Sequence, residues 1–361
     1  MRLNILALPG DGIGVEVTRE AVRVLRHVAG KYGHELVLTE GLLGGVAIHR
    51  TGSPLPEETR RLALEADATL MGAVGLPEFD NAPPDKRPEK GLLGLRQALG
   101  VFANLRPVRA YASQLDSSPL KNHLVEGADM IIVRELTGGI YYGTPRGIFE
   151  DGAETRAVNT MTYTRSEIER VARVAFRLAL GRRKKVTSVD KSNVLENSQL
   201  WRRVVCEVAV EFPEVALDHL LVDNCAMQLI LNPRRFDIVL TENMFGDILS
   251  DEGAVLAGSI GMLPSASIGG RRPSGAWVGL YEPVHGSAPD IAGQNKANPL
   301  GAIGSVAALL EYSFGLKEEA SAVERAVEAA LCSGKVTADL RPCGAPATTE
   351  QVGQAVCAAM G

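Results

Sequence analysis

Two hydrophobic patterns alternate along this chain. Short runs of apolar and β-branched residues, such as residues 3–8 and 236–241, are typical of buried strands. Longer stretches, such as residues 165–180, carry apolar side chains every three or four positions and predict amphipathic helices. The alternation of the two patterns is typical of an α/β protein. We expect further strands at residues 35–39, 69–74, 130–134 and 185–189, and further helices at residues 56–67 and 318–331.

Two segments break this regularity. Residues 75–90 form an irregular stretch that contains Pro77, Pro83, Pro84 and Pro88. A long loop inside a compact enzyme is usually functional. Residues 269–279, with two consecutive arginines and a proline, are predicted to be a surface insertion.

Length and composition narrow the class of protein. The 361 residues exceed one ordinary core, so two domains are expected. With 45% hydrophobic residues and a net charge of −5, the chain is predicted to be globular and soluble. No apolar run is long enough to cross a membrane, and no basic run gives a reason to bind nucleic acid. The N-terminus lacks a signal-peptide pattern, and five cysteines without a CxxC pair suggest neither disulfides nor zinc. We therefore expect a cytoplasmic protein.

Asp247 and Asp251 lie four residues apart, just after the predicted strand 236–241 and a loop at residues 242–246. If a helix starts after that loop, this spacing places both carboxylates on one helix face. Two anions held so close need a positive charge between them, and a hard cation such as Mg²⁺ or Mn²⁺ would supply it. The alternative is a solvated helix N-terminus, where acidic residues are favoured by the helix dipole.

Arg96, Arg106 and Arg134 each lie at the edge of an apolar element. An unpaired guanidinium is unfavourable there, whereas three converging arginines could clamp the carboxylates of a small diacid. The alternative for each arginine is a surface ion pair, with Glu135 as the obvious partner of Arg134.

Tyr141, Lys191 and Asp223 are candidates for proton chemistry and ligand binding. Lys191 ends a predicted strand, and a lysine beside a metal ion has a lowered pKa that suits a general base. Asp223 is flanked by apolar residues and could serve a ligand, or it could cap the helix that follows.

A glycine-rich turn, Gly10 to Gly14, follows the first predicted strand. Its GxGxG spacing differs from the GxGxxG of the Rossmann dinucleotide fold, and Glu40 is poorly placed to be the ribose-binding acid. The turn is therefore interpreted as a tight turn near a ligand, without standard Rossmann binding.

Taken together, these motifs resemble the isocitrate/isopropylmalate dehydrogenase family of β-decarboxylating dehydrogenases. The resemblance covers almost the whole chain and rests on residues 10–14, 91–96, 103–107, 134–141, 189–196, 243–267 and 285–299. It implies an α/β, two-domain fold of isocitrate/isopropylmalate dehydrogenase type rather than a standard Rossmann fold. Residues 1–101 and 258–361 would form the first domain, with both termini and most cofactor contacts. Residues 102–257 would form the second, with the dimer interface and the metal and substrate residues.

The resemblance also implies roles for the charged residues in a homodimer with shared active sites. Asp247 and Asp251 would bind the metal ion in one subunit, while Asp223 reaches metal and substrate from the other. The three arginines Arg96, Arg106 and Arg134 would clamp the malate carboxylates. Tyr141 would protonate the carbon that loses CO₂, and Lys191, also from the other subunit, would accept the hydroxyl proton.

The cofactor and the substrate follow from the same resemblance. The residues implied in cofactor binding are Glu89, Ile13, Asn193, His285, Gly286, Ser287, Ala288, Pro289, Asp290 and Asn298. Asp290 would accept hydrogen bonds from the ribose hydroxyls and repel a 2′-phosphate, which favours NAD⁺. Leu92 and Leu93, with Val194 from across the dimer, would form an apolar pocket for an isopropyl group.

The expected reaction is therefore the oxidative decarboxylation of 3-isopropylmalate to 4-methyl-2-oxopentanoate and CO₂ in leucine biosynthesis. An apolar pocket discriminates neighbouring alkyl groups by only about 1–3 kcal/mol per methylene, so another 3-substituted malate stays open, as do tartrate and homoisocitrate. The chain departs from the family pattern at Val15, Leu76, Phe79 and the pair Gly253-Ala254. None of these departures removes a charged site residue, so they affect the expected kinetic constants and fine specificity only.

Overall fold

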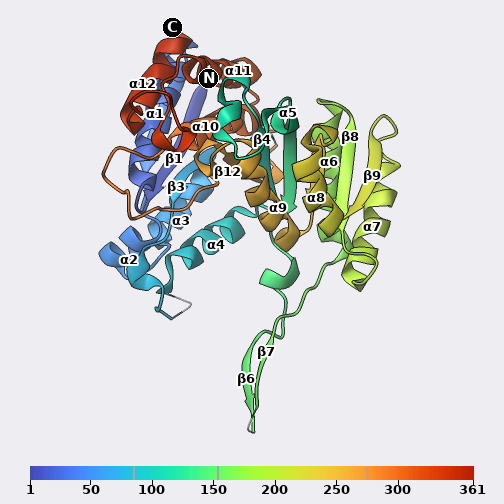
Figure 1. Cartoon of the computed structure of the whole chain (residues 1–361). Coiled ribbons are helices and arrows are strands. Elements are labelled where there is room, and N and C mark those ends of the chain that lie inside the picture. Colours follow the sequence, from blue (N-terminus) through green and yellow to red (C-terminus); the bar gives the residue numbers. More distant parts are fainter. Residues whose placement is uncertain (84–85, 153, 274) are drawn as a thin grey trace. The chain divides into compact units, whose positions relative to one another are not determined.

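The computed structural model describes residues 1–83, 86–152, 154–273 and 275–361 (Figure 1). Residues 84 and 85, including Pro84 of the irregular stretch, lie outside the described residues. The chain forms two compact units. The first unit comprises Met1–Val101, Tyr111–Pro119 and Ala257–Gly361, and the second comprises Phe102–Ala110 and Leu120–Leu256. The sequence-based assignment of the dimer interface and the cofactor contacts to particular domains stays a prediction.

The first unit contains five strands in the order β2-β1-β3-β12-β11. Their bounds are β1 (Arg2–Gly10), β2 (Glu35–Glu40), β3 (Ala68–Ala73), β11 (Pro264–Arg271) and β12 (Trp277–Pro283). β1 pairs in parallel with β2 and β3, and β12 pairs in parallel with β3 but antiparallel with β11. The apolar side chains of β1 and β3 are buried, as their continuous apolar runs predict.

Helices surround these strands in the first unit. They are α1 (Gly14–Lys31), α2 (Gly45–Thr51), α3 (Glu57–Glu65), α4 (Pro88–Leu99), α10 (Leu300–Phe314), α11 (Lys317–Cys332) and α12 (Thr349–Met360). α10 packs against α1, α11 and α12, and it also contacts strands β3, β11 and β12 (Figure 1). Its apolar side chains are buried around most of its circumference, which identifies it as the central helix of this unit's core.

The second unit contains five strands in the order β4-β5-β10-β8-β9. They are β4 (Ala103–Arg109), β5 (Asp129–Glu135), β8 (Lys185–Asp190), β9 (Ala216–Leu221) and β10 (Ile238–Thr241). β4 runs antiparallel to β5, whereas the other pairs are parallel. The register places Thr241 of β10 beside Arg134 of β5 and Val189 of β8. The carboxyl ends of these three strands therefore share one edge, the usual place for a ligand site in a parallel sheet.

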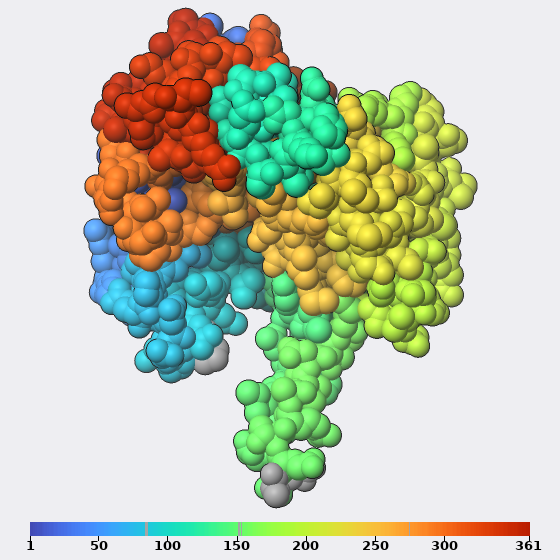
Figure 2. Space-filling view, in the orientation of Figure 1, coloured from blue at the N-terminus to red at the C-terminus, as the bar shows by residue number. Residues whose placement is uncertain are grey.

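The helices of the second unit are α5 (Asn122–Val125), α6 (Arg165–Leu180), α7 (Glu196–Ala209), α8 (Val222–Leu231) and α9 (Asn243–Leu256). α6 has the predicted bounds, and it begins with a capping box between Thr164 and Glu167. A separate antiparallel hairpin, β6 (Gly147–Asp151) and β7 (Glu154–Val158), extends from this unit and is coloured green in Figure 2. Its side chains Ile148 and Phe149 are exposed.

Short 3₁₀ helices complete the described structure. They are η1 (Pro77–Phe79), η3 (Ala112–Ser117), η4 (Gly139–Tyr141), η5 (Pro233–Arg235), η6 (Ile260–Met262) and η7 (Ala338–Leu340).

Most elements predicted from the sequence are present, with ends displaced by one or two residues. Residues 269–279, which were predicted to be a surface insertion, comprise the facing ends of β11 and β12 and the turn between them, of which residue 274 lies outside the described residues. Whether this segment is an insertion stays a prediction. The loop predicted at residues 242–246 is shorter than expected, because α9 already begins at Asn243.

In the described part of the chain, no helix is long and apolar enough to span a membrane. The five cysteines are free thiols in the structure.

Candidate active site

Asp247 and Asp251 lie on one face of α9, as their spacing predicts. The guanidinium of Arg106 reaches both carboxylates, with Nη2 at 3.6 Å from Asp247 Oδ1 and Nη1 at 3.3 Å from Asp251 Oδ1. The two acidic side chains are 37% and 62% exposed, so both are accessible from solvent. A positive charge does lie between the two anions, and in this structure it belongs to an arginine.

Antiparallel pairing of β4 with β5 brings Arg106 and Arg134 to the same site. Both side chains are buried, with residue exposures of only 8% and 5%. Arg106 donates to Asn104 Oδ1 at 2.8 Å and to Ser250 Oγ at 2.6 Å. Arg134 forms an ion pair with Asp247 and donates from Nε and Nη2 to the side-chain oxygen of Asn243. These acceptors compensate the cost of burying two guanidinium groups.

The alternative considered for Arg134, a surface ion pair with Glu135, does not fit the structure, because both residues are buried. Glu135 is fully buried and accepts hydrogen bonds from the backbone of Thr137 and Gly138, each at 2.8 Å. Burial raises the pKa of the Glu135 carboxyl, although these hydrogen bonds and the Arg170 charge oppose the increase.

Tyr141 ends the 3₁₀ helix η4 and contacts one of these acids, Asp247. Its hydroxyl donates to Asp247 Oδ2 at 3.1 Å, and its ring lies 5.8 Å from the Arg134 guanidinium carbon. Partial burial raises the pKa of the Tyr141 phenol, and the negative charge of Asp247 raises it further. The phenol therefore keeps its proton at neutral pH, as a proton donor must.

Lys191 and Asp223 form a second charged group at the same edge of the second unit's sheet. Lys191 follows β8, Asp223 lies in the first turn of α8, and Lys191 Nζ is 3.1 Å from Asp223 Oδ2. The hydrogen bond from Lys191 lowers the pKa of the Asp223 carboxyl. Leu221 occupies the N-cap position of α8, so Asp223 does not cap that helix. Asn193 and Val194 continue the turn after Lys191, and the side chain of Val194 is exposed.

The acids of this unit provide an incomplete cation site. Carboxylate oxygens are the ligands that Mg²⁺ and Mn²⁺ prefer, and Asp247 and Asp251 present them on one helix face. Among the described residues of this chain, however, no three His, Cys, Asp or Glu side chains are grouped to hold a metal ion. The contribution of Asp223 from a second subunit stays a prediction.

In the first unit, α4 carries Leu92, Leu93 and Arg96. Arg96 Nη2 pairs with Glu282 Oε1 of β12 at 2.6 Å, while its buried Nε has no hydrogen-bond partner among the described residues. Leu92 lies one helical turn before Arg96, and Leu93 is 40% exposed. The helix thus presents an apolar surface beside a guanidinium that retains hydrogen-bonding capacity.

The glycine turn of the first unit contacts the segment 285–290. Ile13 N donates to the carbonyl of Ser287 at 2.8 Å. Gly12 has a φ of +56°, and a β-carbon there would overlap that same carbonyl. A β-carbon at Gly75 would lie 3.2 Å from Glu89 Oε1 and 3.5 Å from Ser287 Oγ. Three residues implied in cofactor binding, namely Ile13, Glu89 and Ser287, are therefore close together.

The rest of the segment 285–290 is divided between buried and open positions. His285 is buried, with Nδ1 at 2.8 Å from the Gly286 carbonyl and Nε2 without a partner among the described residues. Burial lowers the pKa of His285, so its imidazole is neutral at pH 7. Gly286, Pro289 and Asp290 are exposed, and Ala288 is half-buried with a φ of +36°. His285 Nε2 lacks a hydrogen-bond partner among the described residues, Gly286 has open space around it, and the Asp290 side chain is exposed. These features suit the binding of a nucleotide whose ribose hydroxyls donate to the Asp290 carboxylate.

Asn298 was also predicted to contact the cofactor. Its side chain is buried, and Nδ2 donates to Asp339 Oδ2 at 3.0 Å while Oδ1 accepts from Leu300 N at 3.0 Å. These bonds engage both ends of its amide inside the protein at the start of α10.

Sequence reasoning missed three buried polar residues that support the site. Asp11 accepts hydrogen bonds from the backbone of Gly45, Val46 and Gly75 at 2.8 to 2.9 Å. Glu282 orients Arg96, and Asn243 contacts Arg134. The available signal was a polar residue directly after or inside an apolar run, which usually has a specific partner.

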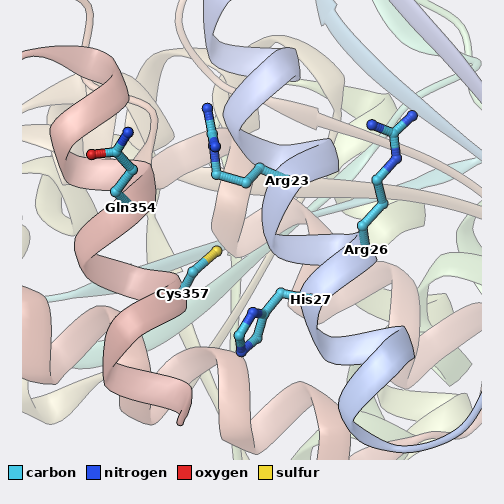
Figure 3. A pocket seen from close by; sticks show the side chains of 5 residues that line it. All are labelled: Arg23, Arg26, His27, Gln354 and Cys357. Atoms are coloured by element: carbon cyan, nitrogen blue, oxygen red, sulfur yellow. The ribbon is translucent and has the colours of Figure 1, made fainter.

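A pocket between α1 and α12 has no predicted site residue in its lining. Figure 3 shows the residues that line it, which are Arg23, Arg26, His27, Gln354 and Cys357. Arg23 is already paired with Glu20 and Glu350. The pocket is therefore a feature separate from the candidate active site.

Comparisons with known proteins show the family of this chain. The model of the isocitrate/isopropylmalate dehydrogenase family matches residues 4–356. The 3-isopropylmalate dehydrogenase of Geobacillus kaustophilus is 60% identical over 94% of this chain and 91% of its own length. That of Halalkalibacterium halodurans is 55% identical over 100% of this chain and 98% of its own.

Solved structures of similar proteins have the same fold. The crystal structure of isocitrate dehydrogenase from Methylococcus capsulatus aligns with a TM-score of 0.86 and 32% identity, covering 99% of each chain. A β-decarboxylating dehydrogenase from Thermococcus kodakarensis aligns with a TM-score of 0.80 and 36% identity, covering 99% of this chain and 96% of that one.

Proposed function

Because the chain belongs to the isocitrate/isopropylmalate dehydrogenase family, we propose that it oxidatively decarboxylates 3-isopropylmalate with NAD⁺. The products are 4-methyl-2-oxopentanoate, CO₂ and NADH, and the reaction serves leucine biosynthesis in the cytoplasm. The observation that carries the proposal is the cluster in which Asp247 contacts Arg106, Arg134 and the protonated Tyr141. The substrate assignment is supported by the 3-isopropylmalate dehydrogenases that are 60% and 55% identical to this chain.

The residues present fit a divalent cation and a dinucleotide. Asp247 and Asp251 would hold Mg²⁺ or Mn²⁺ in one subunit, with Asp223 supplied by the second subunit of a homodimer. The segment from His285 to Asp290, with Ile13, would hold NAD⁺. When bound, NAD⁺ would supply the hydride acceptor, and the divalent cation would supply positive charge for the oxidation and decarboxylation.

The side chains of the chain perform the binding and proton steps. Arg106 and Arg134 bind the substrate carboxylates with guanidinium groups that are already oriented, and Arg96 adds a third clamp. Lys191 of the partner subunit accepts the hydroxyl proton. Tyr141 then donates its proton to the carbon that has lost CO₂.

Selectivity rests on two features of the first unit. Leu92 and Leu93 provide an apolar surface where an isocitrate-specific enzyme would need polar groups for an additional carboxylate. The exposed Asp290 would accept hydrogen bonds from ribose hydroxyls and repel a 2′-phosphate, so NAD⁺ is preferred over NADP⁺.

The test is NADH formation by the purified protein with Mg²⁺ or Mn²⁺, comparing 3-isopropylmalate with isocitrate, homoisocitrate and tartrate. We expect 3-isopropylmalate to have the highest kcat/KM, with activity lost on chelation and restored by excess Mg²⁺. Preference for another acid would overturn the substrate assignment and place the error in the Leu92 and Leu93 pocket. Failure to oxidise any of the four acids would overturn the proposed function itself.

A further inference from the structure

A buried amide connects two residues of the candidate site. Asn243 is the first residue of α9 and is only 1% exposed. Its side-chain oxygen accepts hydrogen bonds from Arg134 Nε at 3.0 Å and Nη2 at 2.7 Å. Its side-chain nitrogen donates to the Gly138 carbonyl at 3.1 Å. One side chain therefore bridges a substrate-binding arginine and the turn that leads to Tyr141.

The two bonds to Asn243 restrict the orientation of the Arg134 guanidinium. An arginine side chain is long and flexible, and its planar fork binds a carboxylate well only when it is correctly oriented. With Nε and Nη2 held by one amide oxygen, Nη1 is directed to Asp247. Gly246 permits this path, because a β-carbon there would lie 2.6 Å from Arg134 Cγ.

A buried hydroxyl holds Asn243 in turn. The Asn243 backbone N–H donates to Tyr163 Oη at 3.0 Å. The same hydroxyl lies 3.3 Å from Glu135 Oε2 and 3.3 Å from Glu242 Oε2. Glu242 accepts from the backbone of Met244 at 3.0 Å and Phe245 at 2.6 Å. The first turn of α9 is thereby fixed by a polar network with little exposure to water.

The same hydroxyl shapes the turn before Tyr141. A β-carbon at Gly138 would lie 2.6 Å from Tyr163 Cε1, and one at Gly139 would lie 2.5 Å from Tyr163 Oη. Gly139 also has a φ of +78°, which a residue with a side chain rarely adopts. The backbone that carries Tyr141 thus lies directly on the Tyr163 ring, and Asn243 ties it to the start of α9.

We propose that Asn243 is a positioning residue, which orients Arg134 toward a substrate carboxylate and sets the placement of the turn that carries the proton donor Tyr141. The proposal rests on the proposed function for the role of its two targets, and it goes beyond that function, which assigns Asn243 no contact with metal or substrate. A misplacement of about 1 Å in such a site costs roughly 10²-fold in rate.

The test compares Asn243→Ala with the wild type by steady-state kinetics. We expect kcat/KM for 3-isopropylmalate to fall about 10²-fold, while KM for NAD⁺ stays within about twofold because the amide contacts no cofactor residue. Ser117→Ala is the matched control, since it removes another buried hydrogen bond, from Ser117 Oγ to the Leu340 carbonyl at 2.7 Å, outside the site. The control should lose stability without a selective change in KM for the acid.

A double-mutant cycle identifies the route of the effect. If Asn243 acts through Arg134, Asn243→Ala should raise KM for the acid much less in an Arg134→Ala background than in the wild type. The same factor in both backgrounds, or an equal rise in KM for NAD⁺, would overturn the proposal. If Asn243→Ala does not fold, Tyr163→Phe takes its place, because this variant keeps the ring and removes only the hydroxyl. We expect kcat/KM for the acid to fall in Tyr163→Phe as well, but by a smaller factor.

The outcome can be separated from that of the proposed function. If the wild type prefers another substituted malate, the same kinetic comparison is made with that acid. If the wild type oxidises no acid, the crystal structure of Asn243→Ala decides, because our proposal requires the Arg134 guanidinium to leave its wild-type orientation. An unchanged Arg134 in that crystal structure would refute the positioning role.

Discussion

Two charged groups in the second unit differ in how completely the chain surrounds them. Around α9, Arg106 and Arg134 are buried and contact Asn104, Ser250 and Asn243 as well as the two acids. Lys191 and Asp223, at the same sheet edge, form an ion pair in which the side chains are 28% and 65% exposed. The two arginines of the first group are enclosed by their own chain, whereas both side chains of the second group are partly or largely exposed.

This difference indicates how each group is used. A buried guanidinium must have its donors satisfied, so the geometry around α9 is determined before any ligand arrives. An exposed ion pair contributes little to stability and can be exchanged for other partners at little cost. This difference fits the proposed roles, in which the α9 group binds the substrate in one subunit and the exposed pair completes the site of a second subunit.

Mixing two inactive variants tests this division most strongly. Lys191→Ala and Asp251→Ala should each reduce kcat by about 10²–10⁴-fold, the usual range for removing a general base or a comparable essential group. If Lys191 serves the neighbouring site, a mixed dimer regains one intact site. Random reassociation of equal amounts should then restore about a quarter of the wild-type activity, since about half of the dimers are mixed.

The measurement is NADH formation after the two proteins are unfolded together, refolded and passed through a size-exclusion column. Each variant treated alone is the control. If the mixture shows no activity beyond that of the separate variants, the exposed pair does not complete a second subunit's site. The proposed division of roles between the two charged groups would then be wrong.

Metal binding should produce the next largest effect, and it should depend on the acids of both groups. A ligand present at 100 times its dissociation constant stabilises a folded protein by about 2.7 kcal/mol. We expect saturating Mg²⁺ to raise the thermal unfolding temperature by several degrees and a chelator to reverse the increase. Asp251→Asn should abolish it, because one carboxylate ligand is lost. A full Mg²⁺-dependent increase in Asp251→Asn would contradict the assignment of Asp251 to the metal.

Two glycines of α9 provide a matched test of how tightly the enclosed group is packed. A β-carbon at Gly246 would overlap Thr241 Oγ1 and approach Arg134 Cγ to 2.6 Å, whereas one at Gly253 would lie 3.1 Å from Val108 Cγ2. Gly246→Ala should reduce the free energy of unfolding by about 1–3 kcal/mol through overpacking and should raise KM for the acid.

Gly253→Ala should cost much less than Gly246→Ala, because a gain in helix propensity of about 0.5–1 kcal/mol offsets a contact that requires the buried Val108 side chain to shift only slightly. Denaturant unfolding and steady-state kinetics of the two variants make the comparison. Equal losses in both would show that the packing around Arg134 is no tighter than elsewhere on α9.

The sequence predicted one part of this arrangement well. The helical period alone places Asp247 and Asp251 on one face, and the contacts of Arg106 with both acids confirm it. The strand patterns were also sufficient to locate β5, β8 and β10, whose carboxyl ends meet at the site. These predictions depend only on local periodicity, which the chain carries directly.

Other parts depend on contacts between distant residues. The alternating strand and helix pattern gives no sign that β4 pairs antiparallel with β5, although that pairing brings Arg106 and Arg134 together. Glu135 was considered a partner of Arg134 because it is adjacent in sequence, but neighbours on a strand point to opposite faces. Asn243 was overlooked because an uncharged amide at the end of an apolar run resembles an ordinary helix start.

The smallest expected effect concerns the exposed pair in the absence of metal. Asp223→Asn removes the 3.1 Å ion pair with Lys191, but a solvated pair of this kind contributes little to folding. In the metal-free protein we therefore expect the unfolding temperature of Asp223→Asn to equal that of the wild type, or to exceed it slightly if a second subunit's acids lie nearby and repel Asp223.

With Mg²⁺ present, the same variant should lose most of the metal-dependent increase, because a carboxylate ligand is missing. Differential scanning calorimetry with and without Mg²⁺ separates these two states. A decrease of many degrees in the unfolding temperature of the metal-free variant would mean that Asp223 stabilises the fold of its own chain. The exposed pair would then have a structural role, and the contrast with the α9 group would not hold.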